Sequence, residues 1–353
     1  MAEIHVALVG VGNCASALVQ GVYMYSGAGE EAEGLAHPNL GGYRPEDVKF
    51  VAAFDVDARK VGRDLGEAIF APPNTTPKFC DVPRLGVRVL RGPVLDGVGG
   101  HLRGIVQVSD VEECDVAEAL RLSGADVVVN LLPSGAVEAS KWYAGRALEA
   151  GCAFINATPT PIANDPNIAG KFRKMGLPLL GDDLMSQIGA TILHKELLSM
   201  LVRRGVRVVE TYQLDVGGGT EALETLGRAR EAKREIKTSS VKSALPYTAP
   251  VVAGSTDYVG FLGNKRESYF WIQGTYFGRT PVRIDVKLST FDGPNAGSVL
   301  LDSIRCAKIA LDRGVGGPLI SISAYAFKNP PEKVPPETAE RWLEEFIRGE
   351  RGN

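Results

Sequence analysis

Ile4-His5-Val6-Ala7-Leu8-Val9-Gly10-Val11-Gly12-Asn13-Cys14-Ala15 is the stretch of this 353-residue chain that decides its fold. The apolar run up to Val9 predicts a buried strand, and the residues after Ala15 continue as a helix. A strand, a glycine-rich turn and a helix in this order are typical of a dinucleotide-binding fingerprint. Gly10 allows the tight turn, Gly12 lets the backbone approach a pyrophosphate, and Ala15 lets the helix pack closely on the strand. Taken alone, the pattern fits a purely structural turn equally well.

A second apolar strand, Lys49–Phe54, ends in Asp55. An acid at the end of the second strand can bind the adenosine ribose hydroxyls, and an acid rather than an arginine favours NAD over NADP. The spacing from the glycines exceeds the usual ~20 residues, and an inserted loop at Tyr25–Pro45 explains the difference. The competing interpretation of Asp55 is a solvated acid at the end of a strand.

Three further apolar runs, Asp126–Leu132, Cys152–Asn156 and Leu177–Leu180, alternate with helical stretches such as Ala136–Ala150. This alternation predicts an α/β fold with a doubly wound parallel sheet, in which ligands bind beyond the carboxyl ends of the strands. The residues that we expect to bind the cofactor at that edge are Gly10, Gly12, Asn13, Cys14, Ala15, Asp55, Pro133, Ser134, Thr158 and Asp182.

The segment Gly181–Thr191 joins the last of these strands to a helix-like run, Ile192–Leu201. Two carboxylates, Asp182 and Asp183, come first, and small polar residues follow them. The free N–H groups and partial positive charge of a helix N-terminus suit a phosphate. The carboxylates suit a ribose hydroxyl, a cation or a proton-transfer network. The segment therefore predicts that a phosphorylated substrate lies beside a second bound partner.

Composition excludes several classes of protein. The net charge is −3 and no basic block appears, which argues against nucleic-acid binding. No apolar run reaches the ~20 residues that a bilayer crossing needs, and a strand that begins at Ile4 leaves no room for a signal peptide. Five scattered cysteines without a CxxC pair predict reduced thiols in a cytoplasmic protein. The four histidines argue against a His-based triad or a histidine-rich zinc site, and His5 and His194 are expected to be structural.

The pattern changes after Leu201. Val206–Val216 reads as a long strand, and Ser268–Phe277 and Val282–Phe291 read as antiparallel strands. In the last of these, apolar residues alternate with polar ones, which predicts a sheet with one polar face. Such a sheet would close over the site or join subunits. Helical character returns at Asn295–Asp312, and the tail ends in an amphipathic helix.

With these elements in place, the chain resembles the bacterial and archaeal branch of the myo-inositol-1-phosphate synthase (inositol-3-phosphate synthase) family, from Val6 to about Pro331. The motifs that carry the resemblance are Val9–Ser16, Ala53–Asp57, Gly181–Thr191, Asp292–Asn295, Ala307–Ala310 and Phe327–Pro330. The resemblance implies a Rossmann-type sheet interrupted by an α+β catalytic and tetramerisation domain with a largely antiparallel sheet. The expected domains are residues 1–200, 201–292 and 293–353, and the expected assembly is a homotetramer.

The resemblance also implies a reaction. The family cyclises D-glucose 6-phosphate to 1L-myo-inositol 1-phosphate by NAD-dependent oxidation at C5, enolisation, intramolecular aldol closure and re-reduction. Such chemistry needs cations beside developing oxyanions and amines that move protons. The matching catalytic residues are Lys233, Lys237, Lys265, Lys328, Asp292 and Asp183, and those expected to hold the phosphate are Ser186, Gln187 and Thr191.

Each lysine receives a role by this resemblance. Lys233 is expected to shuttle the O5 proton, Lys237 and Lys265 to stabilise the phosphate or O1, and Lys328 to polarise O5. A single lysine is more often simply solvated, so the four are weighed together. NAD is the implied cofactor, and a divalent or monovalent cation is left open.

The chain departs from the family pattern at several positions. The family usually has lysine where Met185 stands, and serine is common at Gly293. It usually reads Asn-x-Gly-Gly-Asn-x-Asp where this chain has Asp215, Gly219 and Glu221 at the three polar positions. These departures leave open an enzyme of the same family that acts on another sugar or polyol phosphate, a net NAD oxidoreductase, and a non-catalytic NAD-binding or assembly protein.

Overall fold

Seven parallel strands form the first sheet of the computed structural model, which describes residues 3–353. In spatial order they are β11 (Gly317–Pro318), β6 (Pro178–Leu180), β5 (Ala153–Asn156), β4 (Val127–Asn130), β1 (Ile4–Val9), β2 (Val48–Asp55) and β3 (Val89–Arg91). Every residue of β4 and β5 is buried. This double burial is why their sequences are continuously apolar up to the last residue, an asparagine in each. The predicted doubly wound sheet is confirmed.

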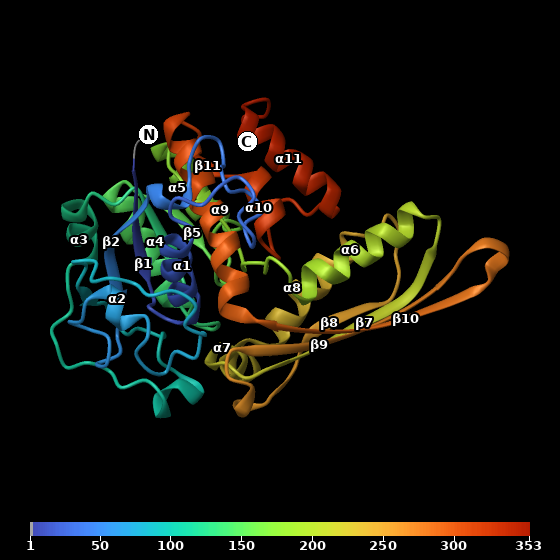
Figure 1. The fold of residues 1–353 in the computed structure, drawn as a ribbon, viewed down its shortest axis with the longest axis horizontal. Helices are drawn as coiled ribbons and strands as arrows, with labels where there is room; N and C mark the ends of the chain where they lie inside the picture. Colours follow the sequence, from blue (N-terminus) through green and yellow to red (C-terminus); the bar gives the residue numbers. More distant parts are fainter. Residues whose placement is uncertain (1–2) are drawn as a thin grey trace.

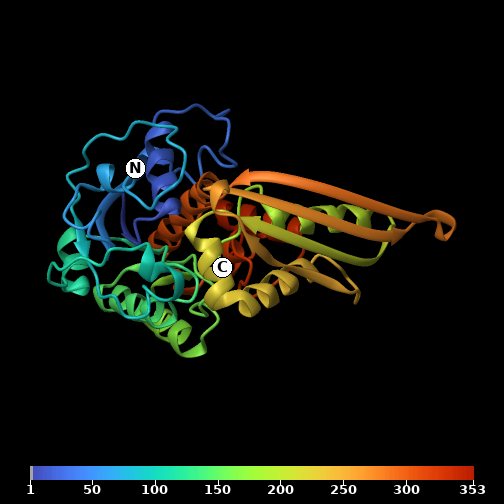
Figure 2. The same ribbon diagram turned by 90° about the horizontal axis from the view of Figure 1, so that it is seen from below.

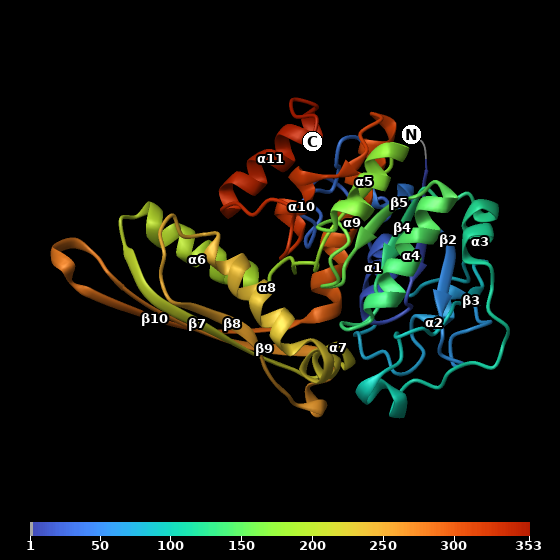
Figure 3. The ribbon, with the colours of Figure 1, turned by 180° about the vertical axis from the view of Figure 1, so that it is seen from behind.

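Helices cover both faces of this sheet (Figures 1 and 3). One face packs against α1 (Asn13–Met24), α9 (Asp292–Asp312), α10 (Ile320–Ala326) and α11 (Pro336–Arg348). The other face packs against α3 (Val116–Ser123), α4 (Val137–Ala150) and α5 (Pro166–Met175). The short helix α2 (Leu65–Ala68) lies between β2 and β3 in the chain. The carboxyl ends of the strands therefore remain as the open edge of the sheet, where ligands bind in folds of this kind.

A second sheet of four strands projects from the first domain (Figures 1 and 2). Its order is β10 (Pro281–Phe291), β9 (Lys265–Thr275), β7 (Arg207–Gly217) and β8 (Val251–Tyr258). β7, β9 and β10 are antiparallel neighbours, as predicted, and β8, which the sequence reading missed, runs parallel to β7. The sheet is thus mixed and mostly antiparallel.

The two faces of the second sheet differ. One face packs against α6 (Ala190–Arg203) and α8 (Arg230–Lys242) through a small core that includes Leu198, Val241 and Ile272. The other face has no helix on it in Figures 1 and 3. It combines charged residues of β10 with Tyr212, Leu214 and Tyr269, which are each 39 to 43% exposed. The face predicted to be polar is therefore polar and aromatic.

The chain crosses between the two sheets at α6 and at α9. α6 begins at Ala190, ahead of the expected boundary at residue 200, and packs on the second sheet. α9 begins at Asp292, directly after β10, and returns to the first sheet beside α1. α7 (Thr220–Glu224) and a π-helical turn, Thr225–Ala229, precede α8. Among the described helices, none is both long enough and apolar enough to cross a membrane.

Candidate active site

The glycine turn after β1 has the backbone geometry that the fingerprint requires. Gly10 has a φ of +89°, and a Cβ at this residue would lie 3.0 Å from the carbonyl oxygen of Leu131. Gly12 precedes α1 without any side-chain cap, and a Cβ there would meet no atom within 4 Å. Gly10 is therefore required by the protein's own packing. Gly12 leaves the first N–H groups of α1 open to a ligand.

Asp55 supports this turn from the end of β2. Its carboxylate accepts hydrogen bonds from the backbone N–H groups of Val11 at 2.8 Å, Val56 at 2.7 Å and Asp57 at 2.9 Å. Its side chain is 12% exposed, and Lys60 Nζ lies 3.9 Å away. The interpretation of Asp55 as a merely solvated acid is therefore wrong. The residue holds the turn in place and still lines the cavity beside it.

One cavity runs from this turn to the second sheet. Of the predicted cofactor residues, it is lined by Gly10, Gly12, Asn13, Cys14, Asp55, Pro133, Ser134 and Thr158. Of the predicted substrate and catalytic residues, it is lined by Asp183, Ser186, Thr191, Lys233, Lys237, Asp292 and Lys328. Ala15 is fully buried beneath the turn, as its packing role predicts. Burial raises the pKa of the Cys14 thiol to about 12, so this lining residue is no nucleophile near neutral pH.

The cofactor role predicted for Asp182 needs correction. This side chain is fully buried and does not line the cavity. Its carboxylate accepts hydrogen bonds from the backbone N–H groups of Ile162, Ala163 and Asn164 and from the side-chain amides of Asn156 and Asn164. Through these five hydrogen bonds the carboxylate fixes the turn after β5. Asp182 is structural, and only its neighbour Asp183 reaches the cavity.

The catalytic role predicted for Lys265 also needs correction. Successive side chains of a strand point to opposite faces, and β9 places Arg266 on the same face as the buried Ser268 and Phe270. Lys265 is exposed on the other face, with its Nζ 5.6 Å from the centre of the Phe291 ring. Arg266 lines the cavity and binds Asp292 through two hydrogen bonds of 2.8 and 2.7 Å. The alternation of buried residues along β9 is the signal that distinguishes Arg266, which faces the cavity, from Lys265, which does not.

Gln187 is the third residue that the structure moves away from the cavity. Its side-chain amide donates a hydrogen bond of 3.0 Å to the carbonyl oxygen of Gly34, and the residue lines a separate groove beside α1 and α9. Ser186 and Thr191 remain in the main cavity, at the start of α6. α6 has no side-chain cap at Gly189, so its first N–H groups are available to a phosphate.

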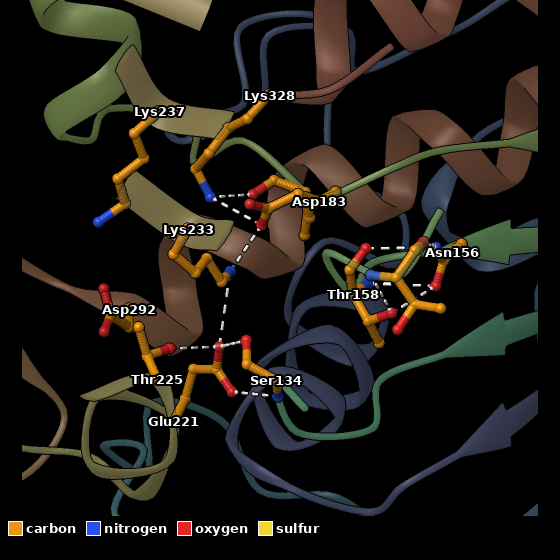
Figure 4. Close-up of polar contacts among 12 residues, drawn as sticks. Ser134, Asn156, Thr158, Asp183, Glu221, Thr225, Lys233, Lys237, Asp292 and Lys328 are labelled. Carbon is orange, nitrogen blue, oxygen red and sulfur yellow. Dashed lines mark hydrogen bonds and ion pairs between the residues drawn. The ribbon is translucent and has the colours of Figure 1, made fainter. Parts of the chain in front are cut away.

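A cluster of amines and carboxylates occupies the end of the cavity nearest the second sheet (Figure 4). Lys233 Nζ lies 2.7 Å from Asp183 Oδ1 and 3.6 Å from Glu221 Oε1. Lys328 Nζ lies 3.3 Å from the same Asp183 oxygen and donates to the carbonyl oxygen of Leu184 at 2.6 Å. Lys237 lies one helical turn after Lys233 on α8 and faces the same side. Asp183 Oδ2 is buried and has no hydrogen-bond partner among residues 3–353.

The two lysines that share Asp183 differ in pKa. Burial lowers the pKa of Lys328 to about 8, although Asp183 opposes that shift. Burial also acts to lower the pKa of Lys233, but Asp183 and Glu221 together outweigh it and raise that pKa. Burial acts to raise the pKa of Asp183, but Lys233 and Lys328 hold it below its usual value. Lys233 is therefore a permanent cation, whereas Lys328 can exchange a proton near neutral pH.

Two of the residues that depart from the family pattern take part in this cluster. Glu221 accepts hydrogen bonds from the Ser134 backbone N–H at 3.0 Å, from the Ser134 hydroxyl, and from the Thr225 hydroxyl at 3.3 Å. It thereby connects α7 to the loop after β4. Asp215 Oδ2 lies 2.7 Å from Lys237 Nζ. Neither carboxylate was among the predicted catalytic residues, although both were noted as departures.

Met185, the remaining departure near the expected phosphate site, lies outside the cavity. This residue is 3% exposed. No group of three or more His, Cys, Asp or Glu residues within residues 3–353 is arranged to hold a metal ion. All five cysteines are unpaired.

Comparisons with known proteins point to one family. A family model described as myo-inositol-1-phosphate synthase matches residues 189–293. The inositol-3-phosphate synthase of Mycobacterium tuberculosis strain H37Rv is 48% identical, over 98% of this chain and 96% of that protein. The inositol-3-phosphate synthase of Corynebacterium glutamicum is 47% identical, over 98% of both chains.

Solved structures show the same fold. The crystal structure of Ari2 matches with a TM-score of 0.78 and 32% identity, over 98% of this chain and 99% of that one. GenD2 from gentamicin A biosynthesis, solved in complex with NAD, matches in fold alone, with a TM-score of 0.50 and 12% identity over 100% and 94% of the chains. With close relatives aligned along nearly its whole length and the site geometry in agreement, this chain belongs to the inositol-3-phosphate synthase family.

Proposed function

We propose that this enzyme converts D-glucose 6-phosphate to 1L-myo-inositol 1-phosphate, with NAD reduced and reoxidised within one catalytic cycle. The observation that carries the proposal is the position of Asp183. This one carboxylate binds both Lys233 and Lys328, in the same cavity as the glycine turn. A redox-neutral cyclisation needs this arrangement, because the groups that move protons must act beside the carbon that loses and regains a hydride.

NAD fits the residues at the other end of the cavity. The open backbone at Gly12 and the uncapped start of α1 suit the pyrophosphate, and Asp55 suits the adenosine ribose. Ser134 and Thr158 line the path from there to the amines. Held by these residues, NAD would supply the hydride acceptor for C5 of the sugar and, as NADH, the hydride donor for its re-reduction.

We assign the roles of the two Asp183-bound lysines from their charge. Lys328, with a pKa of about 8, suits the base that takes the O5 proton and gives it back. Lys233, whose pKa is raised, suits the fixed cation beside O5. This exchanges the roles that the resemblance alone implied.

The remaining groups suit the other end of the sugar phosphate. Ser186, Thr191 and the start of α6 would bind the phosphate. Lys237 and Arg266 would stabilise the negative charge that develops at O1 during ring closure. Arg266 thus takes the place for which Lys265 was predicted, and Asp292 fixes its orientation.

Incubation with D-glucose 6-phosphate and a catalytic amount of NAD tests this function. The expected result is a cyclitol phosphate, identified by NMR, without accumulation of NADH. A net oxidoreductase would instead accumulate NADH in proportion to substrate, and a non-catalytic NAD-binding protein would change neither compound. The proposal fails if no cyclitol phosphate forms across a series of temperatures and added monovalent and divalent cations.

A second candidate is the same ring closure on a different sugar phosphate. The observation that favours it is the pairing of Lys237 with Asp215 and of Lys233 with Glu221, at positions where the family usually carries an amide and a shorter acid. These carboxylates alter the charge and shape that a sugar hydroxyl meets. Hexose 6-phosphates and polyol phosphates assayed in parallel would separate the candidates by their kcat/KM values.

We also propose that the enzyme is a cytoplasmic homotetramer. The helix-free face of the second sheet exposes Tyr212, Leu214 and Tyr269 together, and such a patch suits a contact between subunits. Light scattering coupled to gel filtration would give the mass of the assembly, and Leu214→Asp should lower it. Unchanged mass in that variant would place the contact elsewhere. Cell fractionation would test the location.

A further inference from the structure

A chain of buried hydrogen bonds leads from Lys237 into the interior of the second domain. Lys237 Nζ lies 2.7 Å from Asp215 Oδ2, and Asp215 is 1% exposed. The side-chain nitrogen of Gln213 lies 3.1 and 2.9 Å from the two carboxylate oxygens of Asp215. Gln213 is fully buried and, like Asp215, points from β7 toward the helices. The counter-ion of Lys237 is therefore held from behind by an amide.

His194 continues the chain on α6. Its Nδ1 lies 3.2 Å from Gln213 Oε1, and its Nε2 lies 2.8 Å from the hydroxyl oxygen of Thr211. The ring is fully buried and meets the edge of Phe270 at a centroid distance of 5.5 Å. Burial lowers the pKa of His194 to about 4, so the imidazole is neutral at pH 7. The sequence suggested only a structural histidine here.

Only one neutral form of His194 fits its contact with Gln213. The Gln213 nitrogen faces two carboxylate oxygens and must donate, which leaves its Oε1 as an acceptor facing Nδ1. Nδ1 must therefore carry the hydrogen, which leaves Nε2 of the neutral ring beside the Thr211 hydroxyl, whose own hydrogen is donated to the carbonyl oxygen of Trp271 at 2.7 Å. The other tautomer would set two lone pairs against each other at Nδ1. The donors thus run in one direction, from His194 through Gln213 to Asp215.

We propose that Gln213 and His194 are positioning residues that hold Asp215 ionised and fixed in rotation, so that Lys237 keeps its ammonium group aimed into the active site. The proposal rests on the proposed function only in taking Lys237 to act on the substrate. Because Asp215 is only 1% exposed, its charge needs support from within the protein, and the directed donors supply it.

Other charged groups also affect the pKa values of Asp215 and Lys237. Arg266 on β9 and Lys237 on α8 stabilise the carboxylate and help to hold its pKa below the usual value despite burial. Burial lowers the pKa of Lys237, and repulsion from Arg266 and from Lys233 on α8 lowers it further. Asp215 opposes these effects. Loss of the Gln213 donor should raise the pKa of Asp215. Because it also frees the carboxylate to rotate away from Lys237, it should lower the pKa of Lys237.

Competitive acetylation of lysines measures the second effect without requiring turnover. Lys237 is compared with Lys242, an exposed lysine on the same helix that serves as an internal reference. At pH 8, Gln213→Leu and His194→Leu should each increase the relative labelling of Lys237 by about tenfold, which corresponds to one pKa unit. Thr238→Val is the matched control, because it removes two partly buried hydrogen bonds between α8 and the backbone of Ala253 that do not involve Gln213 or His194. Equal labelling in the leucine variants and the wild type would overturn the proposal.

Kinetics gives an independent test through a double-mutant cycle. Gln213→Leu should lower kcat about tenfold and move the alkaline limb of its pH profile downward, because Lys237 would lose its proton at a lower pH. The same substitution should have no further effect when added to Asp215→Asn, because no carboxylate remains to be held. His194→Gln, which can still donate to Gln213, should recover part of the activity lost in His194→Leu. Full additivity of Gln213→Leu with Asp215→Asn would show a merely structural role. If the wild type forms no cyclitol phosphate, the proposed function fails, while the labelling result still decides the role of Gln213 and His194.

Discussion

The two ends of the cavity are built in different ways. At the cofactor end, the parallel sheet offers backbone: a glycine turn, a helix start and a carboxylate that is bonded to three backbone N–H groups. At the catalytic end, the second sheet and α8 offer charged side chains from distant parts of the chain. Asp183 meets Lys233 across 50 residues and Lys328 across 145 residues. The cofactor end is therefore specified by local sequence, and the catalytic end by the fold as a whole.

This difference predicts how each end responds to mutation. Substitution at the catalytic end should remove activity while the fold and NAD binding persist, since these side chains contribute charge rather than backbone shape. Substitution at the cofactor end should affect NAD binding or stability first. Four predictions test the contrast, in order of decreasing effect.

Lys328→Arg should have the largest effect, on the order of 10³-fold in kcat. Lysine with a pKa of about 8 is protonated below that pH and neutral above it. If it takes the O5 proton as a base, wild-type activity rises as the pH increases through about 8. Arginine stays charged throughout, so the variant should lose this limb as well as the activity. A pH–rate profile of both proteins, with NAD affinity measured by calorimetry, checks the prediction. A retained limb near pH 8 in the variant would assign the titration to another group.

Lys233→Met should lower kcat by about 10². The substitution removes the permanent cation from Asp183 and Glu221 but leaves Lys328 on Asp183. Lys242→Met is the control, because this exposed lysine lies on the same helix and outside the cavity. Steady-state assays of cyclitol phosphate formation should separate the two variants, and equal activity would contradict the placement of Lys233.

Arg266→Met and Lys265→Met compare adjacent residues on opposite faces of β9. Loss of Arg266 leaves Asp292 without its two hydrogen bonds and removes a cation from the cavity. We expect a loss of about 30-fold in kcat/KM. Lys265→Met should stay within about twofold, because this side chain is exposed and outside the cavity lining. A larger effect at Lys265 than at Arg266 would reverse the strand register inferred for the site.

The same contrast explains what could be predicted from the sequence. The parallel strands are predictable because burial on both faces makes them continuous apolar runs, and the glycine turn is local. β8 was missed because its sequence, Val251–Tyr258, mixes glycine with small polar residues and offers no clear period. α8 was missed as a helix because it is mostly charged and contributes few apolar residues to a core.

Errors in the predicted site involve neighbouring residues that face in different directions. Asp182 and Asp183 are adjacent acids, yet the first is tied to five donors in the protein and the second faces the cavity. Family motifs identify such a segment without saying which residue faces the substrate. Only the path of the backbone decides this, as the alternation of β9 does for Lys265 and Arg266. Gln213 and His194 carry no motif at all, because their role depends on contacts between α6 and β7.

Gly12→Ala and Gly10→Ala bring the contrast inside the cofactor end, with the smallest expected effects. A methyl group at Gly12 meets no protein atom within 4 Å, and its φ of −93° suits alanine, so the melting temperature should not change. NAD affinity should nevertheless fall about tenfold, because the methyl group would occupy the side from which the pyrophosphate approaches. At Gly10 the backbone has a positive φ, and a Cβ would lie against the backbone of Leu131. Gly10→Ala should therefore destabilise the fold by about 1–2 kcal/mol. Calorimetric titration with NAD and thermal melts of both variants distinguish a glycine kept for the ligand from one kept for the protein. If Gly12→Ala lowered the melting temperature and bound NAD normally, Gly12 would belong with Gly10, and the turn would be structural in both of its glycines.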